Sequence, residues 1–153
     1  WHELRRRYWS YALPKMSEAN ADNGMFSGCS PSEENWTCGF FGVGGVHISC
    51  IANNDCARVE LYMNGTSKMS AKALFDELDR HRADIEKSLG AERVFWNRGN
   101  DIKHARIFVR NDGLAINDET CWERMAEFHG GWSKKFYDVL VPLVRDYAST
   151  VTR

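Results

Sequence analysis

The sequence predicts an α+β domain, in which two antiparallel β-hairpins form one sheet and helices pack on it in the order α-ββ-α-ββ-α. Two observations carry this prediction. Residues 46–63 and 93–113 hold strand-like runs in which apolar and polar side chains alternate. Residues 70–90 and 117–143 instead repeat apolar side chains at helical spacing. Hairpins separated by helices give an antiparallel sheet with a helical layer on its apolar face.

The N-terminal segment, residues 3–19, predicts a helix, although Pro14 is expected to bend or break it. Its apolar positions close to helical period are Leu4, Tyr8, Tyr11 or Ala12, and Met16. Residues 20–39 are rich in Gly, Ser and Asn and predict a long loop. Trp36 is expected to anchor this loop to the core, with an exposed contact residue as the alternative.

The first hairpin covers residues 46–63, and residues 52–55, Ala-Asn-Asn-Asp, are its predicted turn. Its apolar face is formed by Val46, Ile48, Cys50, Val59, Leu61 and Met63. Its second face carries His47, Ser49, Arg58, Glu60 and Tyr62. Three interpretations of this second face stay open: a solvated face with cross-strand ion pairs, a binding platform, or a network buried under a terminal helix.

A single middle helix is predicted over residues 71–89, with Ser70 as its cap and Gly90 at its end. We expect this helix to lie on the apolar face of the sheet and the terminal helices to extend the same layer. The second hairpin pairs residues 93–98 with residues 104–113.

The last helix begins near Asn117 or Asp118. Gly130–Gly131 weakens its middle and Pro142 bends its end, so the segment can form two helices.

Length and composition predict a single domain over residues 1–153, with 20 basic and 21 acidic residues and a net charge of −1. Any nucleic-acid surface must therefore come from local segregation of charge. Because the chain starts at Trp1, we expect it to be the C-terminal part of a longer protein. No apolar run approaches the ~18 residues of a membrane span and no signal peptide is visible, so a cytoplasmic protein without membrane contact is expected.

The five cysteines are odd in number, and no pair has Cys-x-x-Cys spacing. They are interpreted as free thiols, with a Cys50–Cys56 bridge across the first hairpin as the alternative.

Several segments occur in an order that resembles a known family: YWSYALPKM, SPSEENW, ARVELYM, KALFDELDRHRADIEKSLG, VFWNR, HARIFV and CWERMAEF. From about Tyr8 to about Tyr147 the chain is similar to the bacterial and archaeal domain of unknown function DUF4268. The resemblance implies a domain that often follows a nuclease-like region or is encoded near restriction and defence genes. The family has no agreed activity, so it supplies no catalytic residues. The segment FHGGW departs from the continuous amphipathic helix expected there.

The sequence offers little for catalysis, and no catalytic residue, metal or cofactor is predicted. A metal-dependent nuclease needs clustered acidic residues and often a Glu-x-Lys pair, but Tyr62 stands two residues after Glu60. Asp101-x-Lys103 has this type of spacing and falls in a connecting loop. His47 and Cys50 point to opposite faces of their strand, which excludes them as a nucleophile and base pair.

Basic side chains interleaved with aromatic rings predict a nucleic-acid surface, with a solvated sheet face as the alternative. The candidate residues are Arg58, Tyr62, Trp96, Arg98, Lys103, Arg106, Phe108 and Arg110. Within this set, Arg58 can pair with Glu60 on the same strand face.

We therefore expect a non-catalytic recognition module that contacts DNA or RNA for an attached or neighbouring nuclease domain. The alternative is a protein-interaction or homodimerisation domain, because six tryptophans and eight phenylalanines could form a shared interface. A metal-dependent nuclease is the second alternative.

Overall fold

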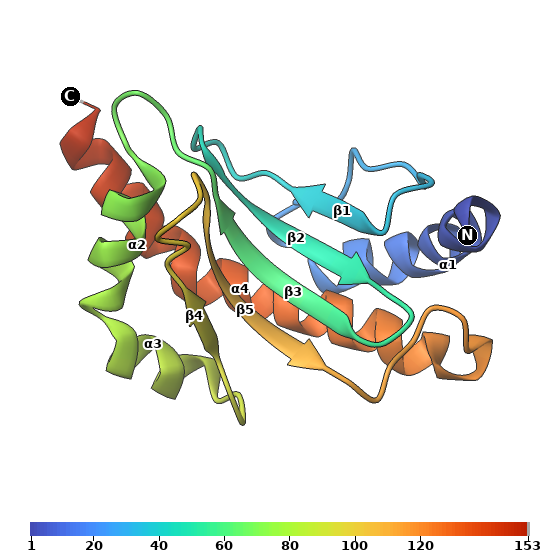
Figure 1. Ribbon diagram of the computed structural model, residues 1–153. Helices are drawn as coiled ribbons and strands as arrows, with labels where there is room; N and C mark the ends of the chain where they lie inside the picture. Colours follow the sequence, from blue (N-terminus) through green and yellow to red (C-terminus); the bar gives the residue numbers. More distant parts are fainter. Residues whose placement is uncertain (153) are drawn as a thin grey trace.

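The computed structural model describes residues 1–152, which form a five-stranded antiparallel sheet with four α-helices gathered on one face (Figure 1). The strand order is β1-β2-β3-β5-β4, so β3 is the central strand. In chain order the elements are α1 (His2–Ala19), β1 (Trp36–Gly39), β2 (Val46–Ala52), β3 (Ala57–Met63), α2 (Ala71–Asp79), α3 (Arg82–Leu89), β4 (Phe95–Asn97), β5 (Ala105–Asn111), the 3₁₀ helix η1 (Glu119–Cys121) and α4 (Trp122–Val151). The predicted α+β class and the order of helices and hairpins are confirmed.

Strand β1 lies within the segment that was predicted to be a loop, and it pairs with β2 at one edge of the sheet. Gly39 ends this strand against the preceding loop. A Cβ at Gly39 would lie 2.1 Å from Cγ of Met25, so the glycine lets the loop pack directly on the strand.

The middle helix is interrupted, whereas a single helix was predicted. Ser70 accepts a hydrogen bond from the N–H of Ala73, and Gly90 ends α3 at a φ of 63°, so both predicted boundaries are confirmed. The interruption falls at Arg80 and His81, in a stretch of charged and imidazole side chains, 79–82, that has no large apolar group to bury. A helical conformation of residues 79–82 would therefore bury no apolar side chain, so packing does not favour a continuous helix at this point.

The last helix is continuous over 30 residues, so the predicted division at Gly130–Gly131 or Pro142 is wrong. A Cβ on Gly130 would lie 3.1 Å from the Cβ of Ala19, which shows that this glycine allows the close approach of α1 to α4. Pro14 likewise lies inside α1 without ending it. Helix α4 packs against β2 and β3, so the last helix covers the centre of the sheet, a place that we expected the middle helix to take.

A buried histidine joins the helices to the sheet. Nδ1 of His129 lies 2.7 Å from the hydroxyl oxygen of Tyr8, and its Nε2 lies 2.9 Å from the carbonyl oxygen of Ile51. Because a carbonyl only accepts, Nε2 carries the proton and Nδ1 accepts from the Tyr8 hydroxyl. Burial lowers the pKa of His129 to about 4, so the imidazole is neutral at neutral pH.

All five cysteines are free thiols, and Cys50 and Cys56 are both buried without a disulfide between them. The prediction of free thiols is confirmed and the alternative bridge is wrong. Among residues 1–152, none of the helices has the length and apolar character needed to cross a membrane.

Candidate functional site

The face of the sheet opposite the helices presents side chains from all five strands, and we call it the open sheet face (Figure 1). Strand pairing arranges these side chains in rows. The central row is Cys38, Ser49, Glu60, Phe108 and Phe95; one flanking row is His47, Tyr62, Arg106 and Asn97; the other is Trp36, Ile51, Arg58 and Arg110. The polar second face of the first hairpin is therefore not covered by a terminal helix, and that interpretation is wrong.

Glu60 lies at the centre of the open sheet face, on the central strand, and only 3% of the residue is exposed. Nη1 of Arg106 donates a hydrogen bond of 2.9 Å to its Oε1, and Nε of Arg58 lies 4.0 Å from the same oxygen. A buried carboxylate is tolerated only when it is paired in this way. The cluster of one carboxylate and two guanidinium groups carries a net positive charge.

The two guanidinium groups also lie near the ring of Phe108, at 5.8 Å for Arg58 and 5.2 Å for Arg106. Phe108 itself stacks on Phe95 with ring centroids 4.8 Å apart. These cation–π contacts hold both arginines beside Glu60. Nε of Arg58 is buried without a hydrogen-bond partner among residues 1–152, so one donor of the cluster is unused.

A second feature of the open sheet face is a series of adjacent rings, which we call the ring stack: Phe40, His47, Tyr62 and His104. His47 lies 5.4 Å from Phe40 and 5.1 Å from Tyr62, and Tyr62 lies 5.1 Å from His104, as distances between ring centroids. Phe40, at one end, is 68% exposed. Burial lowers the pKa of His47, which keeps its ring neutral at neutral pH.

A hollow of about 400 Å³ lies between the ring stack and the arginine pair. Its lining residues are Asn35, Trp36, Cys38, His47, Ser49, Ile51, Arg58, Glu60, Tyr62, His104 and Arg106. Trp36, one of these lining residues, is 46% exposed, so the prediction that this tryptophan anchors its loop to the core is wrong. Burial raises the pKa of the Cys38 thiol, which keeps it protonated and a weak nucleophile at neutral pH.

The structure gathers part of the predicted nucleic-acid surface and separates the rest. Arg58, Tyr62, Arg106, Phe108 and Arg110 lie on the open sheet face. The other predicted residues, Trp96, Arg98 and Lys103, do not.

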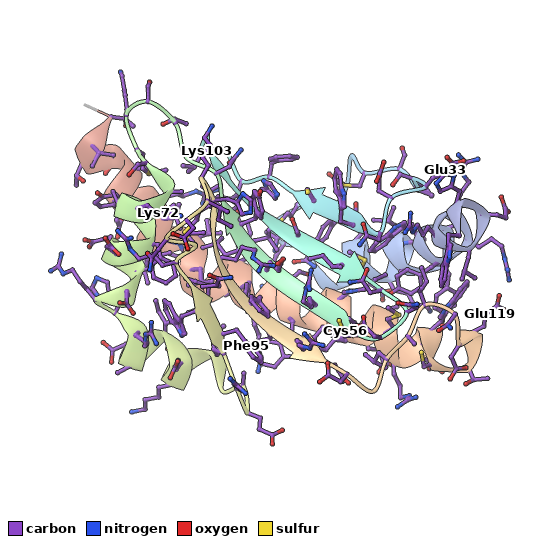
Figure 2. All side chains as sticks on the ribbon, viewed as in Figure 1. Glu33, Cys56, Lys72, Phe95, Lys103 and Glu119 are labelled. Carbon is purple, nitrogen blue, oxygen red and sulfur yellow. The ribbon has the colours of Figure 1, made fainter. Side chains whose placement is uncertain are left out.

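Trp96 points to the helical side, where it packs on Phe75 and its indole N–H donates to Glu86. Arg98 binds the carboxylate of Asp76. Lys103 lies in the loop between β4 and β5, at the opposite end of this strand pair from Phe95 (Figure 2).

The loop between β4 and β5 is held by Lys72 of α2 (Figure 2). Its Nζ donates to the carbonyl oxygens of Arg98 and Gly99 at 2.6 Å and to that of His104 at 2.9 Å. Three carbonyl acceptors satisfy all three donors of an ammonium group. This contact fixes the position of His104 at the end of the ring stack.

Sequence reasoning considered Trp36 as an exposed contact residue only as the alternative, and it did not select four other residues of this site: Cys38, Phe40, Phe95 and His104. Phe95 could have been found from strand alternation, because it shares the parity of Arg93 and Asn97. Phe40 lies outside the strands, and its contact with His47 has no periodic signal. Within residues 1–152, no three His, Cys, Asp or Glu side chains are grouped so that they could hold a metal ion.

The family model described as domain of unknown function (DUF4268) matches residues 4–144, and this chain therefore belongs to that family. No curated protein and no solved structure matches the chain.

Proposed function

We propose that this member of the DUF4268 family is a non-catalytic recognition module that binds single-stranded nucleic acid on its open sheet face. The observation that carries the proposal is the ring stack beside the arginine pair, on the sheet face opposite the four helices of the described residues. In the cell, the module would hold a strand for an attached or neighbouring nuclease domain.

The rings support a ligand with flat, unpaired bases. Phe40 and Trp36 are among the most exposed large apolar side chains of the described residues, at 68% and 46%, and both border the same face. Bases of a single strand stack on such rings, and each stacked base contributes about 1–3 kcal/mol. A duplex keeps its bases paired and stacked on one another, so it cannot use these rings.

The charges support a polyanionic ligand. Arg58, Arg106 and Arg110 lie on this face, and Glu60 is the one carboxylate that the pairing register places among them in the described chain. The excess of positive charge is local, since the whole chain has a net charge of −1. Such a patch can contact phosphates although the protein as a whole is not basic.

The test is fluorescence anisotropy of labelled single-stranded DNA, single-stranded RNA and duplex DNA, titrated with the chain at several salt concentrations. Phe40→Ala should weaken single-strand binding about tenfold, because it removes one stacking platform. Tyr11→Ala is the matched control, since Tyr11 is partly exposed on α1, on the helical side.

Arg110→Ala tests the charges. Arg110 is partly exposed and pairs with Asp112, so its loss should not unfold the sheet. Removing one phosphate contact should reduce the slope of log affinity against log salt by about 0.7. Arg124→Ala, on α4, should leave the slope unchanged. Absence of binding at tens of micromolar protein, or full affinity in both Phe40→Ala and Arg110→Ala, would refute the proposal.

The second candidate is a homodimer or protein interface, which the same exposed rings of Trp36 and Phe40 favour. Light scattering over a wide concentration range distinguishes the two. A mass that doubles with concentration and returns to the monomer in Phe40→Ala supports an interface, whereas a constant monomer mass supports the nucleic-acid proposal.

A further inference from the structure

We infer that the hollow on the open sheet face selects guanine among the bases of the bound strand, with Glu60 as the specificity-determining residue. This inference rests on the proposed function and adds the class of base to it. The observation behind it is a pair of adjacent, unused hydrogen-bonding groups at the centre of the face: one acceptor on Glu60 and one donor on Arg58.

The acceptor is the second oxygen of the Glu60 carboxylate. Arg106 donates to Oε1, and the 4.0 Å approach of Arg58 is also to Oε1. Both contacts therefore leave Oε2 available to a donor of a ligand. Since the residue is 97% covered and lines the hollow, a ligand reaches this oxygen only from within the hollow.

The donors are the terminal N–H groups at Nη1 and Nη2 of Arg58, which bind no acceptor among the described residues and, unlike the buried Nε, are open to a ligand. An acceptor of a ligand in the hollow can bind one of these N–H groups in a charge-assisted hydrogen bond, which is stronger than one between neutral groups. Arg58 also lines the hollow, which places these donors beside the Glu60 acceptor.

The hollow has the size and walls for one base. Its volume of about 400 Å³ lies in the range of small-molecule sites, which is about 300–1,000 Å³. Trp36 lines it and offers a ring face, whereas Tyr62 offers only its ring edge because His47 and His104 stack on its two faces. Arg106 and Ser49 add polar groups. A base that stacks in the hollow therefore turns its polar edge towards Glu60.

Guanine is the base whose edge fits this pair best. Its N1–H and N2–H₂ are two adjacent donors, and both can bind one carboxylate, while the neighbouring O6 accepts from Arg58. Adenine, cytosine and uracil present a single donor next to an acceptor, so an acceptor of the base would face the carboxylate. Because a buried carboxylate is best compensated by donors, the base that offers two adjacent donors should bind best here.

The test uses thymine strands about ten nucleotides long with guanine, inosine, adenine or cytosine at one central position, titrated by anisotropy. The guanine strand should bind about tenfold more tightly than the adenine or cytosine strands. Inosine keeps N1–H and O6 and lacks only the N2 amino group, so it should lose about tenfold relative to guanine. This comparison changes only the ligand, and it remains valid whatever a protein variant does to folding.

Glu60→Gln should bring the guanine and inosine strands to equal affinity, because one acceptor oxygen becomes an NH2 donor, which cannot bind the N2 amino group of guanine. Asp112→Asn is the matched control: Asp112 pairs with Arg110 outside the hollow, and its loss should leave the ratio unchanged. Equal binding of all four wild-type strands, or an unchanged guanine-to-inosine ratio in a folded Glu60→Gln variant, overturns the guanine inference while strand binding stands. Failure of every strand to bind removes both proposals.

Discussion

Lowering the pH from neutral towards 4 should destabilise the protein through the protonation of His129 in the unfolded chain. Burial lowers the pKa of this imidazole to about 4, against 6.5 for the unperturbed side chain. Between these two values the unfolded chain binds a proton that the folded chain does not, so the free energy of unfolding falls as the pH falls. The contribution is fully present above pH 6.5 and is lost progressively towards pH 4.

The magnitude follows from the difference of about 2.5 pKa units. At about 1.36 kcal/mol for each unit, His129 accounts for about 3 kcal/mol between pH 6.5 and 4, or about 1.4 kcal/mol per pH unit within that range. A change of this size is a large part of the stability of a small domain, which is about 5–15 kcal/mol.

Urea denaturation at several pH values between 7.5 and 4.5, followed by tryptophan fluorescence, measures this slope. The fully buried Trp9 supplies the signal. His47, whose pKa is also lowered by burial, adds to the slope in the same pH range. The lowered pKa values of Asp22, Asp76 and Asp118 remove stability only below about pH 4, where these carboxyls are protonated.

His129→Gln isolates the effect, because glutamine can still donate to the carbonyl of Ile51 but does not titrate. The variant should be less stable than the wild type at pH 7.5 and should show a much shallower slope between pH 6.5 and 4.5. An identical slope in both proteins would refute the assignment of this titration to His129.

Two further predictions concern the contact of α1 with α4 and the loop between β4 and β5. Gly130→Ala should destabilise the protein by about 1–3 kcal/mol, because the added Cβ lies 3.1 Å from the Cβ of Ala19 at the contact of α1 with α4. Gly131→Ala, next to it and with no atom within 4 Å of the added Cβ, should instead stabilise by up to about 1 kcal/mol, and thermal unfolding of the pair compares them directly. Lys72→Met should release the loop between β4 and β5, and hydrogen exchange of residues 98–104 measures this change. Because His104 is then no longer held, the variant should also bind single-stranded nucleic acid more weakly. Unchanged exchange would show that Lys72 does not hold the loop.

The sheet could largely be predicted from the sequence, because apolar and polar side chains alternate along all of β3 and along most of β2 and β5. Strand β1 could not, since its four residues end in glycine and carry no periodic signal. The interruption after α2 has no sequence marker, because neither glycine nor proline stands at Arg80 or His81.

The candidate site could be predicted only as far as alternation within one strand extends. Arg58, Glu60 and Tyr62 share a parity, and so do Arg106 and Phe108, which placed each set on one face. Whether the even-numbered residues of two paired strands face the same side of the sheet depends on the register of the pairing, which the sequence does not determine. Trp96 was grouped with Phe108 for this reason, although the pairing of Phe95 with Phe108 sends Trp96 to the helical side.

The arginine pair around Glu60 raises the question of whether this cluster exists for stability or for binding. Replacing a buried ion pair and its partners by apolar side chains of similar size is often neutral or stabilising, whereas removing one partner leaves a buried charge uncompensated. Arg106→Met alone should therefore cost about 2 kcal/mol, the value of a hydrogen bond to a charged group.

The triple variant Arg58→Met, Glu60→Met and Arg106→Met should restore stability to within about 1 kcal/mol of the wild type, since neither a charge nor an unpaired polar group is left buried. If the cluster serves binding, this stable protein should bind single strands weakly and without preference for guanine. Chemical denaturation and anisotropy on the same preparations separate the two roles. A triple variant that is much less stable than Arg106→Met would assign the cluster to the fold, whereas a stable variant with wild-type affinity would remove these side chains from the binding surface.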